Sequence, residues 1–96
     1  LKIRASVNLV AEPHDHAAVL NITASDRPGL LATIALVLVE VGLEITSARI
    51  TTLGERVEDV FHLTDASRGP IADIDIVRRV EKTICEELGD ISQTTD

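Results

Sequence analysis

A hexapeptide in the first third of the chain combines residue types that can bind a small charged ligand: Asp26, Arg27, Pro28, Gly29, Leu30 and Leu31. It separates a run typical of a strand from an apolar run typical of a helix, so we expect it to begin that helix. Asp26 is the predicted cap, Pro28 fixes φ in the first turn, and Gly29 lets other atoms approach the backbone. Unpaired N–H groups at such a helix end favour an anionic group. A capped helix without a ligand would have the same residues, so spacing alone leaves both interpretations open.

A free amino acid has chemistry that matches this segment, because it carries a carboxylate, an ammonium group and a side chain. The amides of Gly29, Leu30 and Leu31 can receive the carboxylate, or the carbonyl of a side-chain amide. Asp26 can accept a hydrogen bond from an ammonium group or an amide N–H. Arg27 either reaches the carboxylate or lies in solvent. The hexapeptide is therefore a candidate ligand-binding loop.

Two histidines close to each other raise the question of a metal site. His14, Asp15 and His16 lie in a predicted turn, and no further Cys or His is spaced to complete a ligand set. We therefore favour polar turn residues over a native metal site.

Three polar residues accompany Phe61 along a predicted strand. Asp59 and Asp65 fall near the strand ends on the same side as Phe61, and we expect them to make turn or loop hydrogen bonds. His62 falls on the opposite face, where a surface or interface role is expected. Cys85 lies on the apolar stripe of a predicted helix, so we expect a buried small hydrophobic residue rather than a nucleophile.

No catalytic arrangement is apparent in the sequence. Neither a Ser/His/Asp set, a Cys/His set, a phosphate-binding loop nor a general acid–base pair occurs. We therefore expect that this chain is not an enzyme by itself and that it uses no cofactor.

Composition narrows the class of protein further. The 96 residues suffice for one domain, and 45% of them are hydrophobic, so the chain should fold. A net charge of −7 and an aromatic content of 1% argue against a nucleic acid or an anionic membrane as partner. A single cysteine fits a reducing compartment, and we expect a soluble cytoplasmic domain. Because no methionine occurs, even at position 1, we expect a segment of a longer polypeptide.

The hydrophobic pattern predicts two strands and a helix in the first half of the chain. Residues 3–11 and 18–24 alternate with a period of two, which predicts a hairpin. The following helix has an apolar stripe, after which Gly42 is expected as the C′ residue: Leu30, Ile34, Leu38 and Val41. Three apolar residues lie off this stripe, so we expect a second subunit or domain to cover them: Leu36, Val37 and Val39.

The second half repeats the order of strand, strand and helix. Residues 44–53 form a predicted strand with a possible bulge near 46–47, and a tight turn at Gly54 leads into a strand over 57–65. A second helix runs from about Asp73 to Gly89, with one buried face: Val77, Val80, Ile84 and Leu88. Residues 90–96 carry no pattern and are expected to be a disordered tail.

These elements predict an α+β fold in which two helices cover one face of a four-stranded, mainly antiparallel sheet. Right-handed crossovers place the second strand beside the fourth, as in ferredoxin-like folds. The first strand, residues 3–11, then fills the edge beside the second. We expect a single domain over residues 1–89 in the order ββαββα.

The hexapeptide, together with residues 42–45, 48–50 and 59–61, resembles the ACT domain. This family consists of small regulatory modules that often bind amino acids and have a βαββαβ fold. The resemblance covers roughly residues 17–89. More narrowly, residues 48–65 are similar to the C-terminal ACT domain of bacterial PII-protein uridylyltransferase/uridylyl-removing enzymes. One departure is that no closing strand follows the second helix, so the strand at 3–11 is expected in its place.

The resemblance implies regulation by a free amino acid. In enzymes of this kind, glutamine bound to the ACT region switches the parent between uridylylating and deuridylylating the PII protein. The parent is expected to need a divalent metal. Two alternatives remain: an ACT domain of another regulated enzyme, such as a guanosine-tetraphosphate synthetase/hydrolase or an amino-acid pathway enzyme, or a purely dimerising module.

The resemblance also implies where the ligand binds. The loop would be residues 26–31, and a second ACT domain, in a homodimer or a tandem pair, would complete the pocket. Its contribution would come from one strand: Ile45, Ser47, Ala48 and Ile50.

Overall fold

The computed structural model describes residues 4–11 and 17–88. Its elements follow the expected order ββαββα: β1 (Ser6–Val10), β2 (Ala18–Ser25), α1 (Leu30–Glu40), β3 (Leu43–Leu53), β4 (Arg56–Asp65) and α2 (Ile74–Leu88). The tail at 90–96 and the turn that holds His14, Asp15 and His16 lie outside the described residues, so the predictions made for them stay predictions. Neither described helix is long and apolar enough to cross a membrane.

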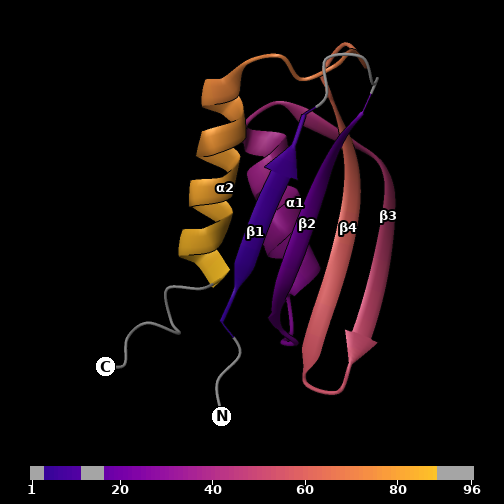
Figure 1. Ribbon diagram of the computed structural model, residues 1–96, viewed down its shortest axis with the longest axis vertical. Helices are drawn as coiled ribbons and strands as arrows, with labels where there is room; N and C mark the ends of the chain where they lie inside the picture. The colour runs from indigo at the N-terminus through magenta and orange to yellow at the C-terminus, as the bar shows by residue number, and fades with distance from the viewer. Residues whose placement is uncertain (1–3, 12–16, 89–96) are drawn as a thin grey trace.

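The four strands form one antiparallel sheet with the order β1-β2-β4-β3 (Figure 1). β2 pairs with β4 along its whole length, from Ala18 opposite Leu63 to Ser25 opposite Arg56. β1 pairs with β2 and so occupies the edge that was predicted for it. The strand is shorter than expected, since it spans Ser6–Val10 rather than residues 3–11. The predicted ferredoxin-like topology is confirmed.

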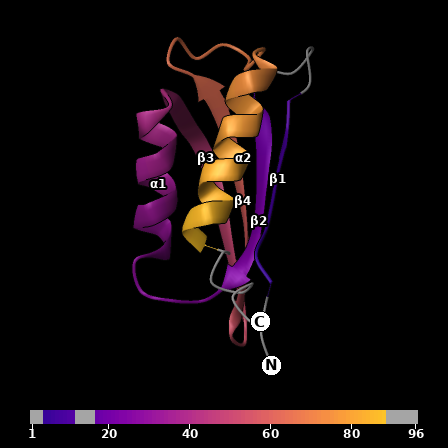
Figure 2. The same cartoon turned by 90° about the vertical axis from the view of Figure 1, so that its left-hand side faces the viewer.

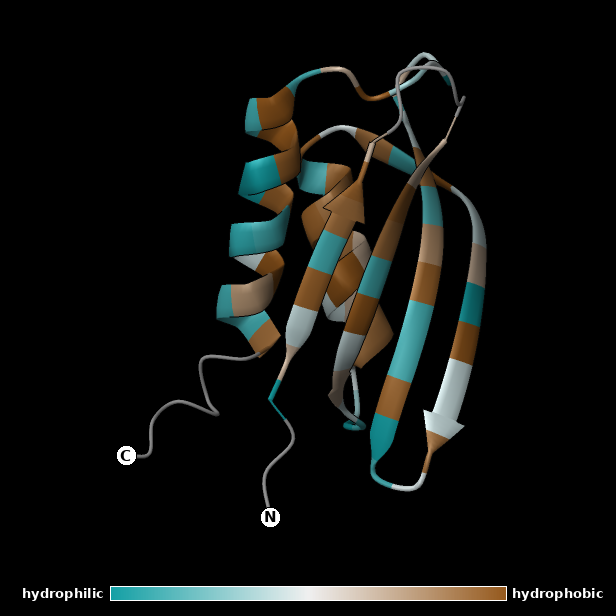
Figure 3. Cartoon of the chain, in the orientation of Figure 1, coloured by the Kyte–Doolittle hydropathy of each residue, from teal (hydrophilic) through white to brown (hydrophobic). Residues whose placement is uncertain are grey.

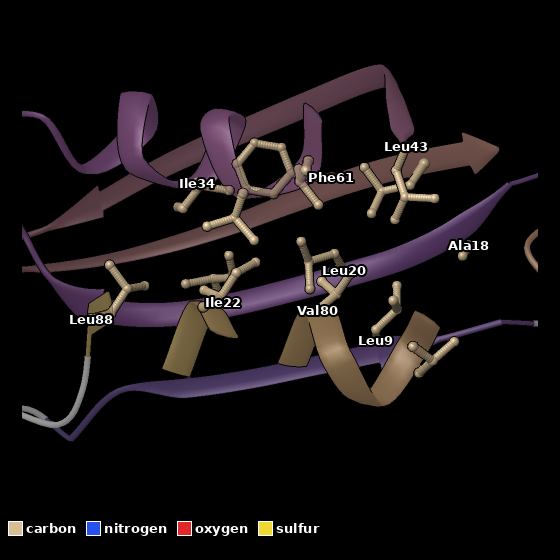
Figure 4. Packing of buried hydrophobic residues seen from close by; sticks show 14 of the residues in the cluster. Leu9, Ala18, Leu20, Ile22, Ile34, Leu43, Phe61, Val80 and Leu88 are labelled. Atoms are coloured by element: carbon tan, nitrogen blue, oxygen red, sulfur yellow. The ribbon is translucent and has the colours of Figure 1, made fainter. Parts of the chain in front are cut away.

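Both helices lie on the same face of the sheet, and the core fills the space between the two layers (Figure 2). Figure 4 shows side chains of the helices and of the strands pointing into this common layer. Seven of the core residues are at most 1% exposed: Leu20, Ile22, Ile34, Leu38, Leu63, Val80 and Ile84. Phe61 is the aromatic member of an otherwise aliphatic core. Burial of this apolar surface is the main force that holds helices and sheet together.

Helix α1 is apolar around most of its circumference, whereas α2 has one apolar and one charged face (Figure 3). Val37 is only 6% exposed and packs in the core, so the expectation that it belongs to an exposed interface is wrong. It lies three residues after Ile34 and therefore on the same side of the helix. Gly42 follows the helix with φ of 80°, as predicted for a C′ glycine. Cys85 of α2 is exposed rather than buried, because it stands one residue beyond the buried Ile84.

Strand β3 contains the predicted bulge. Ile45 pairs with Leu63 and Ser47 with His62, so Thr46 is the extra residue. Directly opposed residues of a sheet share a face, and the bulge therefore puts Ile45 and Ala48 on the helix side although they are three positions apart.

The two edges of the sheet differ in their cover. At β1, the backbone N–H of Leu9 donates a hydrogen bond of 2.8 Å to Oε2 of Glu81 on α2. At the other edge, every residue from Glu44 to Ile50 of β3 is exposed. Within the described residues, β3 pairs only with β4. An exposed edge strand of this kind is a surface on which another strand can pair.

Candidate ligand-binding site

The loop between β2 and α1 is a tight turn placed before the helix. The carbonyl of Arg27 accepts a hydrogen bond from the N–H of Leu30 at 3.3 Å, with Pro28 and Gly29 in between. Gly29 has φ of 79° and ψ of 3°, the values of the third residue of a type II turn. Its carbonyl accepts the N–H of Thr33 at 2.9 Å, so the helix begins after this glycine.

This turn overturns the predicted cap. Gly29 is the N-cap residue of α1, and no side chain makes a cap hydrogen bond. Asp26 is separated from the helix by the turn, and its own N–H donates to the carbonyl of Glu55 at 2.8 Å. Pro28 likewise precedes the helix rather than occupying its first turn. Helix α1 therefore starts with no carboxylate bonded to its N-terminal amides.

The N-terminal amides of α1 remain available to a ligand as a result. Within the described part of the chain, the N–H groups of Leu31 and Ala32 have no hydrogen-bond acceptor. The first turn of the helix holds no acidic residue. Such a helix end binds carboxylates and other anions through its N–H groups and its dipole.

A cavity of about 230 Å³ lies at this helix end. The loop and the first turn form one side of it: Asp26, Arg27, Gly29, Leu30, Leu31 and Ala32. Strands β3 and β4 form the other side: Ile50 and Thr52 of β3, with Val57 and Asp59 of β4. The volume is below the range of about 300–1,000 Å³ that drug-sized ligands occupy, and it suits a single small metabolite.

Asp59 is the most unusual residue of this cavity. It is 1% exposed, and neither oxygen of its carboxylate has a hydrogen-bond partner within the described residues. Its cross-strand neighbours are the apolar Ile22 and Ile50. Burial, and to a smaller extent the negative charge of Asp26, raise the pKa of the Asp59 carboxyl. The expected turn or loop hydrogen bonds are therefore wrong for Asp59.

The same expectation is confirmed for Asp65. Its Oδ1 accepts the N–H of Ser67 at 2.9 Å and that of Gly69 at 2.7 Å, which holds the loop after β4. The two carboxylates thus have opposite environments, although both stand on the side of Phe61.

The guanidinium of Arg27 is already engaged in a contact with α2. It donates a hydrogen bond of 2.8 Å to the carbonyl of Glu87, in the last turn of α2. A positive charge at a helix C-terminus is electrostatically favourable. The contact ties the candidate loop to the end of α2, which neither of the two predicted roles of Arg27 included.

A family model matches most of this chain. The model of the N-terminal ACT domain of the ACR family covers residues 13–90. The chain belongs to the ACT-domain family. Its strand order and two-layer arrangement agree with that assignment.

The curated relatives of this ACT domain are much longer than the domain itself. The chain is 48% identical over 71 residues to a bifunctional uridylyltransferase/uridylyl-removing enzyme of Pseudomonas aeruginosa, with 74% of the chain and 8% of the relative covered. A protein of the same description from Ectopseudomonas mendocina is 47% identical over 74 residues, with 77% and 8% covered. Another from Pseudomonas putida is 41% identical over 93 residues, with 92% and 10% covered. The ACT domain thus spans a tenth or less of the length of these relatives.

The strand residues expected to serve a partner domain do not all face the same way. Ile45, Ala48 and Ile50 lie on the helix side of β3, opposite Leu63, Phe61 and Asp59. Ser47 lies on the other side, where its Oγ is 3.0 Å from Nδ1 of His62. Ser47 is therefore not on the face of the other three residues.

Sequence reasoning missed part of the cavity in this ACT domain. Thr52, Val57 and Asp59 line it from the chain's own strands, and Ile50 does so too instead of serving only a second domain. The alternation of β4 contained a usable signal, because Asp59 has the same parity as the buried Val57 and Phe61.

A second cavity, of about 330 Å³, lies beside the start of α2. Its walls are apolar side chains: Ala11, Pro70, Ile71, Ala72, Ile74 and Val77. Since none of the described residues that line it is charged, the smaller cavity is the better candidate for an amino-acid site.

Proposed function

We propose that this ACT domain is a regulatory sensor of a free amino acid, that the amino acid is glutamine, and that it controls a longer parent enzyme. The observation that carries the proposal is one small cavity whose lining includes both the start of an uncapped helix and a carboxylate without a partner among the described residues. A zwitterion has one group for each. The relatives' description as bifunctional uridylyltransferase/uridylyl-removing enzymes supports a parent that adds and removes uridylyl groups.

The parent would act on the PII nitrogen-regulatory protein in the cytoplasm and would use a divalent metal in its catalytic domains. The ACT domain would supply regulation without a cofactor of its own. Glutamine bound at the β2–α1 loop would report nitrogen sufficiency to those domains.

The ligand carboxylate would bind at the start of α1. Leu30 already donates its N–H to Arg27, so the donors open to a ligand are those of Leu31 and Ala32. Asp26 would accept from a ligand N–H at the rim of the cavity. Arg27 would act through its contact with the end of α2 rather than as the carboxylate partner.

A second ACT domain would pack against α1 and β3, either in a homodimer or in a tandem pair. Leu36 and Val39 of α1 are 59% and 69% exposed, and Ile45 and Ile50 of β3 are 41% and 43% exposed. Exposed apolar side chains on neighbouring elements are typical of association surfaces. The unpaired edge of β3 adds hydrogen-bonding groups for a partner strand.

Thermal unfolding against the common L-amino acids tests the proposal. At a ligand concentration of 100 times Kd, binding stabilises the folded chain by about 2.7 kcal/mol. In a domain of this size, 1 kcal/mol shifts Tm by roughly 4–8 °C. We expect glutamine to give the largest shift, with D-glutamine as the stereochemical control.

Oligomeric state is measured on the same sample by light scattering, with Leu36→Glu as the variant that weakens association. A larger shift with another amino acid would assign the domain to a different regulated enzyme. Stabilisation by no amino acid, in a sample that is dimeric, would contradict sensing and favour a purely dimerising module.

A further inference from the structure

Asp59 is a buried carboxylate, and no contact among the described residues accounts for its burial. It occupies a strand position whose neighbours on the same face, Val57 and Phe61, are core residues. Both of its oxygens lack partners among residues 4–11 and 17–88, although most buried side-chain polar atoms in proteins have at least one hydrogen bond. A valine at this position would suit the strand and the core better. The carboxylate is therefore unfavourable for folding alone.

The surroundings of Asp59 define what it lacks. Asp26, the other carboxylate of the cavity, adds negative charge, and Ile22 and Ile50 supply no donor. Arg27, the one guanidinium of the lining, donates to the carbonyl of Glu87. Asp59 thus makes the strand side of the cavity negative, and this side needs a cationic N–H donor.

The opposite side of the cavity has the complementary chemistry. The N–H groups of Leu31 and Ala32 begin helix α1 without an acceptor among the described residues. Leu30, Ile50 and Val57 add apolar side chains to the lining. An α-amino acid carries its ammonium group and its carboxylate on one carbon atom, so both sides can be engaged at once.

We propose that Asp59 is the acceptor of the ligand's α-ammonium group, and that it makes the cavity select α-amino acids over carboxylic acids of the same shape. This inference rests on the proposed amino-acid sensing and deepens it by assigning the selective residue. The ion pair would form at a carboxylate that is itself buried from water, where a charge-assisted hydrogen bond is strong. Asp59 then stabilises the ligand-bound domain and destabilises the unliganded one.

Isothermal titration calorimetry of the 96-residue chain tests the assignment with two probes. L-glutamine carries the ammonium group, and 5-amino-5-oxopentanoate is the same molecule without it. We expect the wild-type chain to bind glutamine about 10- to 100-fold more tightly, as the loss of a charge-assisted hydrogen bond implies. In Asp59→Asn, the affinity for glutamine should fall by a similar factor, and the affinities for the two probes should differ by less than about threefold.

Glu58→Gln is the matched control, because it removes a carboxylate from the same strand at a residue that pairs with Arg56 on the surface. It should bind both probes like the wild type. If Asp59→Asn keeps the wild-type preference for glutamine, the ammonium group is held elsewhere and the inference is wrong. Equal binding of the two probes to the wild type would also refute it, without relying on any variant.

The two proposals fail in different ways. Absence of heat with glutamine and with the other common amino acids in the wild type would refute sensing, and this inference with it. Binding that is independent of Asp59 would refute this inference alone. Saturable binding of MgCl₂ or KCl that Asp59→Asn abolishes, together with an unchanged glutamine affinity, would assign the carboxylate to a metal ion instead.

Discussion

Replacement of Asp59 by valine is expected to stabilise the unliganded chain at neutral pH. The side chain is 1% exposed and both carboxylate oxygens lack partners, so folding removes the carboxylate from water without compensation. Valine removes both oxygens from the buried position and favours strands. A stabilising effect would be unusual, because most substitutions of buried residues destabilise a protein.

The size of the effect follows from the burial of the group. Leaving a polar group buried and unsatisfied costs about 1–3 kcal/mol, and more for a charged group. We therefore expect Asp59→Val to gain at least about 1 kcal/mol in the free energy of unfolding at pH 7. In a domain of this length, that gain raises Tm by roughly 4–8 °C.

The gain must also depend on pH. Burial and the charge of Asp26 raise the pKa of Asp59 in the folded state above its ordinary value of about 3.9. The stability contributed by the protonated group is fully present below that ordinary value and is lost as the pH rises through the raised one. The advantage of Asp59→Val should accordingly be small near pH 4 and grow towards pH 7.

Urea denaturation followed by circular dichroism, at pH 4, 5, 6 and 7, measures the difference. Glu58→Val is the control, since it places the same residue next to Asp59, where the carboxylate is partly exposed and forms a surface ion pair of 3.3 Å with Arg56. Its effect should not follow the pH dependence of Asp59→Val. A loss of stability in Asp59→Val, or a gain that is constant from pH 4 to 7, would refute this account of Asp59.

Two further substitutions test the elements around the cavity. Glu81→Ala removes the acceptor of the Leu9 N–H, so it should destabilise the chain by about 1.5–3 kcal/mol and speed hydrogen exchange at Leu9. Glu86→Ala, on the exposed side of α2, is the control and should do neither. Unchanged exchange at Leu9 in Glu81→Ala would argue against the hydrogen bond. Gly29→Ala should lower stability by about 1–2 kcal/mol, because a φ of 79° is strained for alanine while a Cβ there meets nothing within 4 Å. Gly29→Asn should fall between glycine and alanine in Tm, and equal Tm values for all three would contradict the positive φ.

The fold was predictable because its periodicities are strong. Alternation along β2 and the spacing of Val77, Val80 and Ile84 on α2 leave little choice of element or of buried face. The bulge in β3 could be seen in the sequence because Ile45, Ala48 and Ile50 break a strict alternation while all remain apolar or small. Short connections and right-handed crossovers then restricted the strand order.

The errors concern positions where two rules compete. Asp26 and Gly29 are both acceptable N-cap residues, and the type II turn that decides between them depends on Pro28 and Gly29 adopting it together. For Asp59, strand parity predicted burial, whereas the rarity of unpaired buried carboxylates favoured a hydrogen-bonded turn. The alternation of β4 predicted the burial of Asp59 correctly. Asp59 departs from the rule that buried carboxylates have partners, and it is the residue that we assign to the ligand. Helix faces are about a third of the circumference wide, so Val37 and Cys85 at the borders of their stripes were misplaced.

The carboxylate of Glu81 has a consequence for how large an assembly can become. By occupying the amide of Leu9, it hinders the pairing of another strand with β1, whereas no such contact covers β3 among the described residues. Two copies related by a twofold axis can pair their β3 strands with each other, and neither then has a second edge to offer. A sheet that can add strands on both sides would instead grow into a filament. One charged residue on a helix thus favours a closed pair over open-ended growth of the sheet.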